Sequence, residues 1–190
     1  RALCGSGAGS ANGVASDVAV VILRGRKPQM LGGVGRAIVP HLAHGQLVLS
    51  VLAGATTAAL RGILGHDQVV RSMPNTPARL GKGMTVWYAT PDATDEQRAQ
   101  AAALLGALGH QLEVDDEKMV AMATAVSGTG PTYVFLVMEA LIDAAVHLGF
   151  PRHIAHELVI ETLEGSTLFS NHPRRHPADT PHTVPSPAAP

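Results

Sequence analysis

The residues best suited to chemistry in this chain of 190 residues are Ser127, Gly128, Thr129 and Gly130. Glycine lets a backbone approach a ligand closely, and exposed amides and hydroxyls can donate hydrogen bonds to an anion. Pro131 follows directly, and proline suits the first turn of a helix, where its missing N–H would have no partner anyway. The pattern predicts a ligand-approaching loop that leads into a helix. A flexible lead-in without a ligand fits the same residues equally well.

Three earlier segments, 24–30, 52–56 and 71–82, follow short apolar runs, and each offers backbone amides, small residues or a basic side chain. The third contains two prolines around Asn75, a composition that ends regular structure and shapes a loop. In open α/β sheets, ligands bind at the carboxyl ends of the strands. Each segment alone is compatible with an ordinary turn. Their repetition favours a cleft for a phosphate-bearing, nucleotide-type ligand.

Other chemistries find less support in the sequence. The histidine pairs 153/156 and 172/176 have no third ligand at a convincing spacing, so surface histidines are favoured over a metal site. No serine or cysteine stands in a hydrolase signature. Cys4 is the single cysteine, which excludes an intramolecular disulfide and fits a reducing cytosol. A formal net charge of −1 and 3% aromatic residues argue against nucleic acid and anionic membranes as partners.

The elements that must position these segments alternate along the first two thirds of the chain. Apolar, β-branched runs and one weakly alternating segment predict strands, and apolar residues at helical spacing or helix-start signals predict the helices between them. Such an order is typical of a parallel sheet with crossover helices. The predicted strands cover residues 18–23, 47–51, 69–71, 84–88 and 111–114, and the predicted helices cover 31–43, 56–64 and 94–108.

The last third is predicted to be helical. A helix begins near residues 115–117 and leads into the Ser127 segment, and residues 152–170 form another helix. Between them, residues 131–148 are apolar almost all round, which predicts a buried helix that ends at Gly149. Charged residues interrupt it too often for a confident membrane span. One neighbouring helix cannot cover so much apolar surface, so we expect a partner subunit to complete the burial.

Several blocks in a fixed order within residues 17–170 resemble the pyrroline-5-carboxylate reductase family. The blocks are KPQ at 27–29, SVLAG at 50–54, VRSMPNTP at 70–77, GKG at 81–83, TAVSGTGPTY at 124–133 and EALIDAAVHLG at 139–149.

The resemblance implies a cytoplasmic oxidoreductase that reduces 1-pyrroline-5-carboxylate to L-proline with NADPH or NADH, the last step of proline biosynthesis. It implies an α/β fold in which a partial Rossmann-type parallel sheet, residues 17–122, precedes an all-helical dimerisation and substrate domain, residues 123–170. The expected partners are the small-molecule substrate and further copies of the chain in a homodimer or larger homo-oligomer. Residues 1–16 are expected to be flexible, and the proline-rich residues 171–190 are expected to form an extended or disordered tail.

The resemblance also implies roles for individual residues. The substrate would lie near the segment Ser127, Gly128, Thr129 and Gly130. The cofactor would lie along Lys27, Pro28, Ala53, Gly54, Met73, Asn75 and Glu117. No catalytic side chain and no metal are implied, because the protein mainly positions the cofactor and the imine for hydride transfer.

Two segments depart from the family pattern. Residues 1–16 stand where the family has a glycine-rich fingerprint, and residues 184–190 stand where it has a motif that grips the substrate carboxylate. A gene fragment or a shifted reading frame is our hypothesis for both ends. A non-catalytic fragment or pseudoenzyme that keeps the helical dimer module is therefore the alternative function. A related oxidoreductase for another small substrate is disfavoured by the paired motifs at 73–76 and 127–131.

Overall fold

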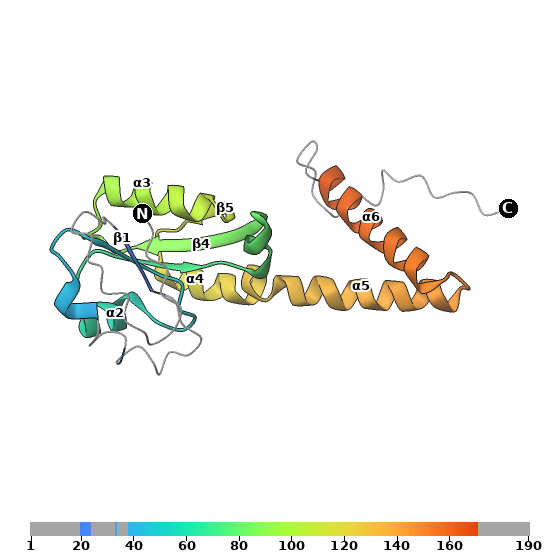
Figure 1. Cartoon of the computed structure of the whole chain (residues 1–190), viewed down its shortest axis with the longest axis horizontal. Helices are drawn as coiled ribbons and strands as arrows, with labels where there is room; N and C mark the ends of the chain where they lie inside the picture. The colour runs from blue at the N-terminus through green and yellow to red at the C-terminus, as the bar shows by residue number, and fades with distance from the viewer. Residues whose placement is uncertain (1–19, 24–32, 34–37, 171–190) are drawn as a thin grey trace. The chain divides into compact units, whose positions relative to one another are not determined.

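The structure, a computed structural model, describes residues 20–23, 33 and 38–170 (Figure 1). The chain divides into two compact units, Arg1–Pro131 and Thr132–Pro190. The predictions for residues 1–16 and 171–190, and residues 31, 32 and 34–37 of the predicted helix 31–43, lie outside the described residues. The predicted domain boundary follows residue 122, whereas the division between the two units follows Pro131.

The strands of the described part of the chain form one five-stranded sheet in the order β1-β2-β3-β4-β5. Strands β1 to β3 are mutually parallel, as the sequence predicts, whereas β4 runs antiparallel to β3 and parallel to β5. Only the short 3₁₀ helix η3 (Thr76–Leu80) connects β3 to β4, and a short connection between neighbouring strands favours the antiparallel direction. The strands are β1 (Val20–Leu23), β2 (Leu47–Ser50), β3 (Val69–Met73), β4 (Gly83–Ala89) and β5 (Gly109–Glu113).

Local signals set the starts of two of the helices that pack on this sheet. Helix α2 (Thr57–Leu64) begins after Thr56, whose hydroxyl accepts a hydrogen bond from the Ala59 amide at 3.2 Å. Helix α3 (Asp95–Gly106) begins with a capping box between Thr94 and Gln97. Both helices begin one residue after their predicted starts at residues 56 and 94. The predicted C-terminus of the second helix, at residue 108, is two residues too late. The short 3₁₀ helix η2 (Val39–His41) precedes β2.

The sheet is covered on both faces, with α3 on one side and α2 and α4 (Glu117–Ala123) on the other (Figure 1). Side chains alternate along β3 and β4, so neighbouring residues serve opposite layers. Val69 packs with α2, whereas Val70 packs with α3. Trp87 packs under α3, whereas Val86 contacts the layer of α4. This arrangement confirms the predicted α/β class.

Helices α5 (Gly130–His147) and α6 (Arg152–Ser170) form the helical unit. Its small core is Ile142, Ala155 and Val159. Gly149 turns the chain between the helices with φ of 106°, a conformation that favours glycine. The exposed Arg152 guanidinium pairs with Asp143 at 2.6 Å across the turn.

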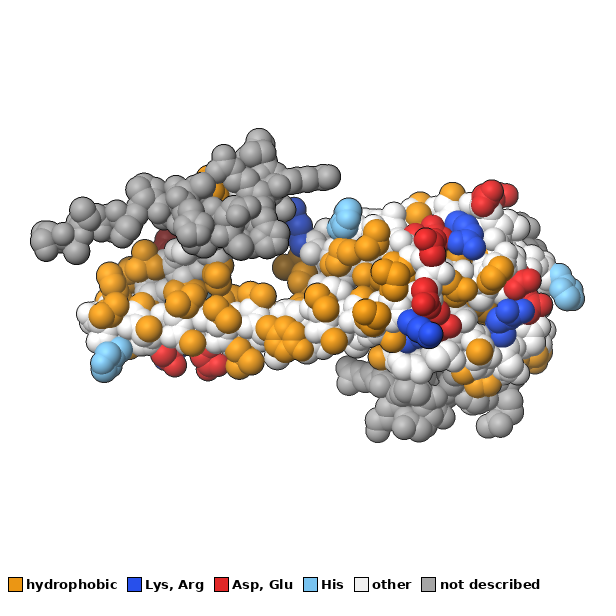
Figure 2. Space-filling model, turned by 180° about the vertical axis from the view of Figure 1, so that it is seen from behind, with side chains coloured by type: hydrophobic (Ala, Val, Ile, Leu, Met, Phe, Trp, Pro, Cys, Tyr) orange, Lys and Arg blue, Asp and Glu red, His pale blue; other side chains and the backbone are white. Residues whose placement is uncertain are grey.

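Burial of the central helix within the chain is not observed. Of α5, all of which the structure describes, only Ile142 is buried. Apolar side chains are therefore frequent on the surface along this helix (Figure 2). Among the described residues, one helical stretch, Glu117–His147, is long and apolar enough to cross a membrane by length and composition alone. One such stretch is a weak indication of a membrane span. The exposed large apolar residues of α5 are Tyr133, Val134, Phe135, Leu136, Val137 and Leu141.

Candidate functional site

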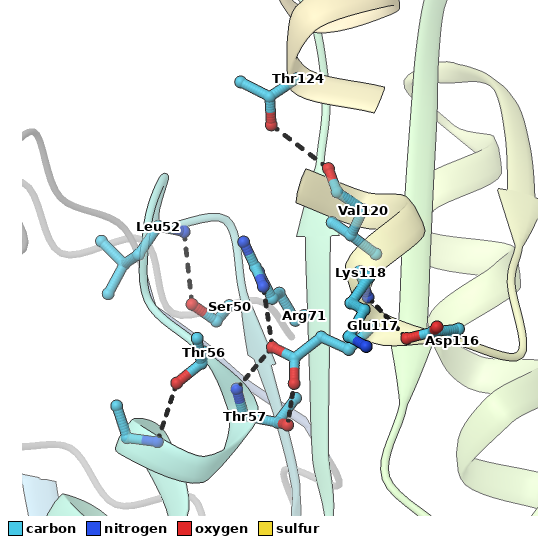
Figure 3. A network of polar contacts seen from close by, with 11 residues as sticks. Ser50, Leu52, Thr56, Thr57, Arg71, Asp116, Glu117, Lys118, Val120 and Thr124 are labelled. Carbon is cyan, nitrogen blue, oxygen red and sulfur yellow. Dashed lines mark hydrogen bonds and ion pairs between the residues drawn. The ribbon is translucent and has the colours of Figure 1, made fainter. Parts of the chain in front are cut away.

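The carboxyl ends of β2 and β3 lie beside the start of α4, where Glu117 is the first helical residue (Figure 3). Its Oε1 atom accepts hydrogen bonds from the Thr57 amide at 2.8 Å and from Arg71 Nη1 at 2.8 Å. Its Oε2 atom accepts a hydrogen bond from the Thr57 hydroxyl at 2.6 Å. One carboxylate thus joins the first turn of α2, the strand β3 and the start of α4.

The charges of this network are largely shielded from water. The Arg71 side chain is 9% exposed and the Glu117 side chain is 23% exposed. Burial by itself raises the pKa of the Glu117 carboxyl, but the hydrogen bonds from Thr57 and the pairing with Arg71 outweigh burial and lower the pKa below its usual value. The folded chain therefore holds Glu117 as a charged carboxylate.

The segment between β2 and α2 contains two of the predicted cofactor residues, Ala53 and Gly54. Both are exposed, and Gly54 has φ of 79°, which a larger residue would adopt only with strain. The segment is fixed at both ends, because the Leu52 amide donates to Ser50 Oγ at 3.3 Å and Thr57 binds Glu117. A small, exposed backbone turn at the end of a parallel strand suits close approach by a flat ligand.

Four predicted site residues from distant parts of the chain come together beside η3 and β4. The Asn75 side chain donates from Nδ2 to the Ser127 carbonyl at 3.1 Å and accepts from the Met84 amide at Oδ1 at 2.9 Å. A Cβ atom at Gly128 would lie 3.2 Å from Cε of Met73, which is tight. The glycine therefore lets the backbone approach the Met73 side chain.

The prediction of a loop before the central helix is wrong, because residues Thr124–Gly128 form the π-helical turn η4. The hydroxyls predicted to serve an anion donate to the backbone instead. Ser127 Oγ donates to the Ala123 carbonyl at 3.1 Å, and Thr129 Oγ1 donates to the Thr124 carbonyl at 2.9 Å. Isolated π-turns are frequent at functional sites, so the segment stays a candidate, but as a rigid turn.

The sequence predictions assigned no role to two members of this site, although Arg71 begins the predicted segment 71–82. Thr57 follows a helix N-cap, and nothing local distinguishes it from the other residues of a first turn. Arg71 carries a signal that could have identified it: an arginine inside a buried, β-branched strand needs a partner. Of the remaining predicted residues, Lys27 and Pro28 lie outside the described residues, and Gly130 begins α5.

Chemically, the described residues provide a frame that can hold a ligand. Backbone turns follow β2 and β3, and a π-turn lies against Met73. The ion pair between Arg71 and Glu117 connects β3 to the start of α4. Such a frame suits a reaction in which the reacting groups belong to bound molecules and the protein orients them.

Comparison with known proteins identifies a matching family and relatives of this chain. The model of the pyrroline-5-carboxylate reductase dimerisation family matches residues 117–189. Pyrroline-5-carboxylate reductase from Pseudomonas aeruginosa is 40% identical over 173 residues, which are 90% of this chain and 63% of that protein. The enzyme of the same name from Corynebacterium melassecola is 36% identical over 181 residues, which are 93% of this chain and 67% of the relative.

Solved structures show the same relationship. The pyrroline-5-carboxylate reductase of Coxiella burnetii superposes with a TM-score of 0.81 at 31% identity, covering 90% of this chain and 63% of that chain. The Plasmodium falciparum pyrroline carboxylate reductase, solved with NADP bound, gives a TM-score of 0.81 at 28% identity, with coverages of 90% and 64%. The chain thus spans somewhat less than two thirds of the length of the first of these relatives. The resemblance seen in the sequence is confirmed: this chain belongs to the pyrroline-5-carboxylate reductase family.

Proposed function

We propose that the chain carries out NAD(P)H-dependent reduction of 1-pyrroline-5-carboxylate to L-proline, in the cytoplasm, as the last step of proline biosynthesis. The observation that carries the proposal is its identity of 36% to 40% with named pyrroline-5-carboxylate reductases over nine tenths of its own length. The NADP bound to the Plasmodium falciparum relative supports a nicotinamide cofactor. The exposed backbone turn at Gly54 is compatible with a bound nicotinamide cofactor.

The reaction asks the protein mainly for orientation. When bound, a nicotinamide cofactor would supply the hydride for the imine carbon of the pyrroline, and the ring nitrogen would carry the proton of the product amine. We assign the cofactor side to Ala53, Gly54 and Met73, and the substrate side to the turn from Ser127 to Gly130. Holding two reactants in alignment removes much of the entropic part of the barrier, and a π-turn braced by hydrogen bonds provides a fixed wall for that purpose.

The direct test is oxidation of NADPH, and separately of NADH, by the purified full chain with and without 1-pyrroline-5-carboxylate. We expect cofactor oxidation that depends on the substrate and yields proline in equal amount. Absence of binding of either cofactor, in a chain shown to be folded by circular dichroism, would refute the proposal. That result would favour the alternative, a non-catalytic chain that keeps the helical dimer module.

We also propose that the chain self-associates through its helical unit. The family model that matches residues 117–189 describes a dimerisation region, and Tyr133, Val137 and Leu141 expose apolar surface at helical spacing along α5. Burial of such a stripe against a second copy removes it from water. The expected species is a homodimer or a larger homo-oligomer.

Val137→Lys is expected to weaken self-association at least about tenfold, because a lysine in a desolvated apolar contact loses its hydration without gaining a partner. Sedimentation velocity across a range of concentrations measures the change. Glu139→Lys is the matched control, since it introduces the same side chain on another face of α5. A wild-type chain that sediments as a monomer at every concentration would contradict the proposal.

A further inference from the structure

Asn75 connects two parts of the fold that are far apart in the sequence. Its side-chain amide is oriented without ambiguity, because the Met84 amide can only donate and the Ser127 carbonyl can only accept. The acceptor Oδ1 must therefore face Met84 at 2.9 Å, and the donor Nδ2 must face Ser127 at 3.1 Å. Both ends of the amide are thus engaged by the protein, at β4 on one side and at η4 on the other.

The hydrogen bond from Asn75 to the Ser127 carbonyl replaces one that Pro131 cannot donate. In an α-helix the Ser127 carbonyl would accept a hydrogen bond from the residue four positions later, which is Pro131. Proline has no N–H, and its ring also crowds that carbonyl. The Asn75 amide donates to the Ser127 carbonyl in its place. The motif around Asn75 and the motif that ends in Pro131 are therefore physically coupled.

The consequence of this coupling is the position of Gly128. The turn η4 lies on β4 with Gly128 against Met73, at a distance where an added Cβ would be only 3.2 Å from the methionine Cε atom. A turn that moved would lose this close fit. Hydroxyl back-bonds from Ser127 and Thr129 stiffen the turn internally, but Asn75 is what anchors it to the sheet.

We infer that Asn75 is a positioning residue: it holds the Ser127 turn on β4 and does not bind the cofactor itself. The catalytic consequence of this inference rests on the proposed function, in which the turn forms the substrate side of the site. Its structural part, anchoring of the turn, is independent of catalysis. The role differs from the cofactor contact that the family resemblance implies for this residue.

Asn75→Asp tests the inference because it is isosteric and removes one bond only. The carboxylate can still accept from the Met84 amide, but it cannot donate to the Ser127 carbonyl and repels it. We expect hydrogen exchange of the Thr129 amide, which bonds to the Thr124 carbonyl at 2.8 Å, to become at least about tenfold faster. Exchange of the Val48 amide in the parallel sheet, bonded to Gln68 at 2.9 Å, stays unchanged.

Ligand measurements on the same variant separate positioning from direct binding. We expect the substrate KM to rise about tenfold or more, while the Kd of NADPH, from fluorescence titration, changes less than about threefold. Gln111→Glu is the matched control: it is also an amide-to-acid change, but its Oε1 only accepts, from Trp87 Nε1 at 2.5 Å. The control is expected to leave Thr129 exchange and both ligand constants unchanged.

The outcomes are distinct. Weakened NADPH binding with unchanged Thr129 exchange would overturn the inference and favour a direct cofactor contact. Unchanged exchange and unchanged constants would overturn it as well. A wild-type chain that binds no NADPH would refute the proposed function, and the exchange comparison would still decide whether Asn75 anchors the turn.

Discussion

Replacing Gly109 with valine is expected to lower the free energy of unfolding of the unit that contains the sheet by about 3 kcal/mol or more. There is no space for a side chain at residue 109, and the backbone conformation there is one that residues other than glycine rarely adopt. Gly109 has φ of +130°, and a Cβ atom would lie 2.5 Å from Gly83 N and closer still to Gly83 O. Valine adds two further carbons at the same place. The start of the β4–β5 pairing must then separate.

The damage is expected to extend from the sheet to the site. The Gly83 amide donates to the Leu108 carbonyl at 2.8 Å beside the clash, and the next residue, Met84, is the one whose amide binds Asn75. Displacement of the start of β4 therefore disturbs the anchor of the Ser127 turn. Urea unfolding followed by Trp87 fluorescence measures the stability change, since this buried tryptophan lies on β4.

Gly106→Ala is the matched control for this prediction. Gly106 is the last residue of α3, its φ is not positive, and no atom of the described residues is recorded within 4 Å of an added Cβ. Alanine is expected to leave stability unchanged or raise it by up to about 1 kcal/mol, because it reduces the entropy of the unfolded chain. A Gly109→Val variant as stable as the control would show that the backbone at residue 109 relaxes without cost.

The elements of the sheet unit could be predicted because each has a local signal. Strands β1 and β2 are runs of mostly branched apolar residues, and two helices start at threonine caps at residues 56 and 94. The direction of β4 has no such signal. It depends on how the chain between Met73 and Gly83 turns, and prolines at 74 and 77 are compatible with either direction.

The candidate site was predictable as a set of segments but not as a set of contacts. Glycine, serine and threonine before Pro131 suggested a loop, because these residues often form one. Their hydroxyls instead satisfied backbone carbonyls and made a helical turn possible. Contacts such as Glu117 with Thr57, or Asn75 with Ser127, join residues more than 50 positions apart, and no local pattern encodes such pairs.

The second large effect is expected at Glu117. Glu117→Gln should reduce the free energy of unfolding at pH 7 by about 2 kcal/mol, because the nearly buried Arg71 loses its countercharge and hydrogen bonds to charged groups are the stronger kind. The glutamine Oε1 can still accept the two bonds at 2.8 Å, but it carries no charge, and its Nε2 cannot accept the bond that the Thr57 hydroxyl donates to Oε2 of Glu117. Thermal or urea unfolding at several pH values measures the effect.

Glu113→Gln is the matched control, the same chemical change in an ion pair with Arg98. Its side chain is 36% exposed, against 23% for Glu117. Water screens such a pair, so the expected loss is below about 1 kcal/mol. Equal losses in the two variants would mean that the Glu117 network contributes no more than a surface ion pair.

The pH dependence of the stability provides an independent check on the sign of this effect. The pKa of Glu117 is lower in the folded chain than its usual value of 4.5, so the unfolded chain binds a proton more readily. The stabilisation by the carboxylate is therefore fully present above pH 4.5 and is lost as the pH falls through the lower pKa of the folded state. Glutamine does not titrate. The difference in stability between wild type and Glu117→Gln should hence shrink in acid, and a difference that grows below pH 4.5 would contradict the assignment of Glu117 as the charged partner of Arg71 and Thr57.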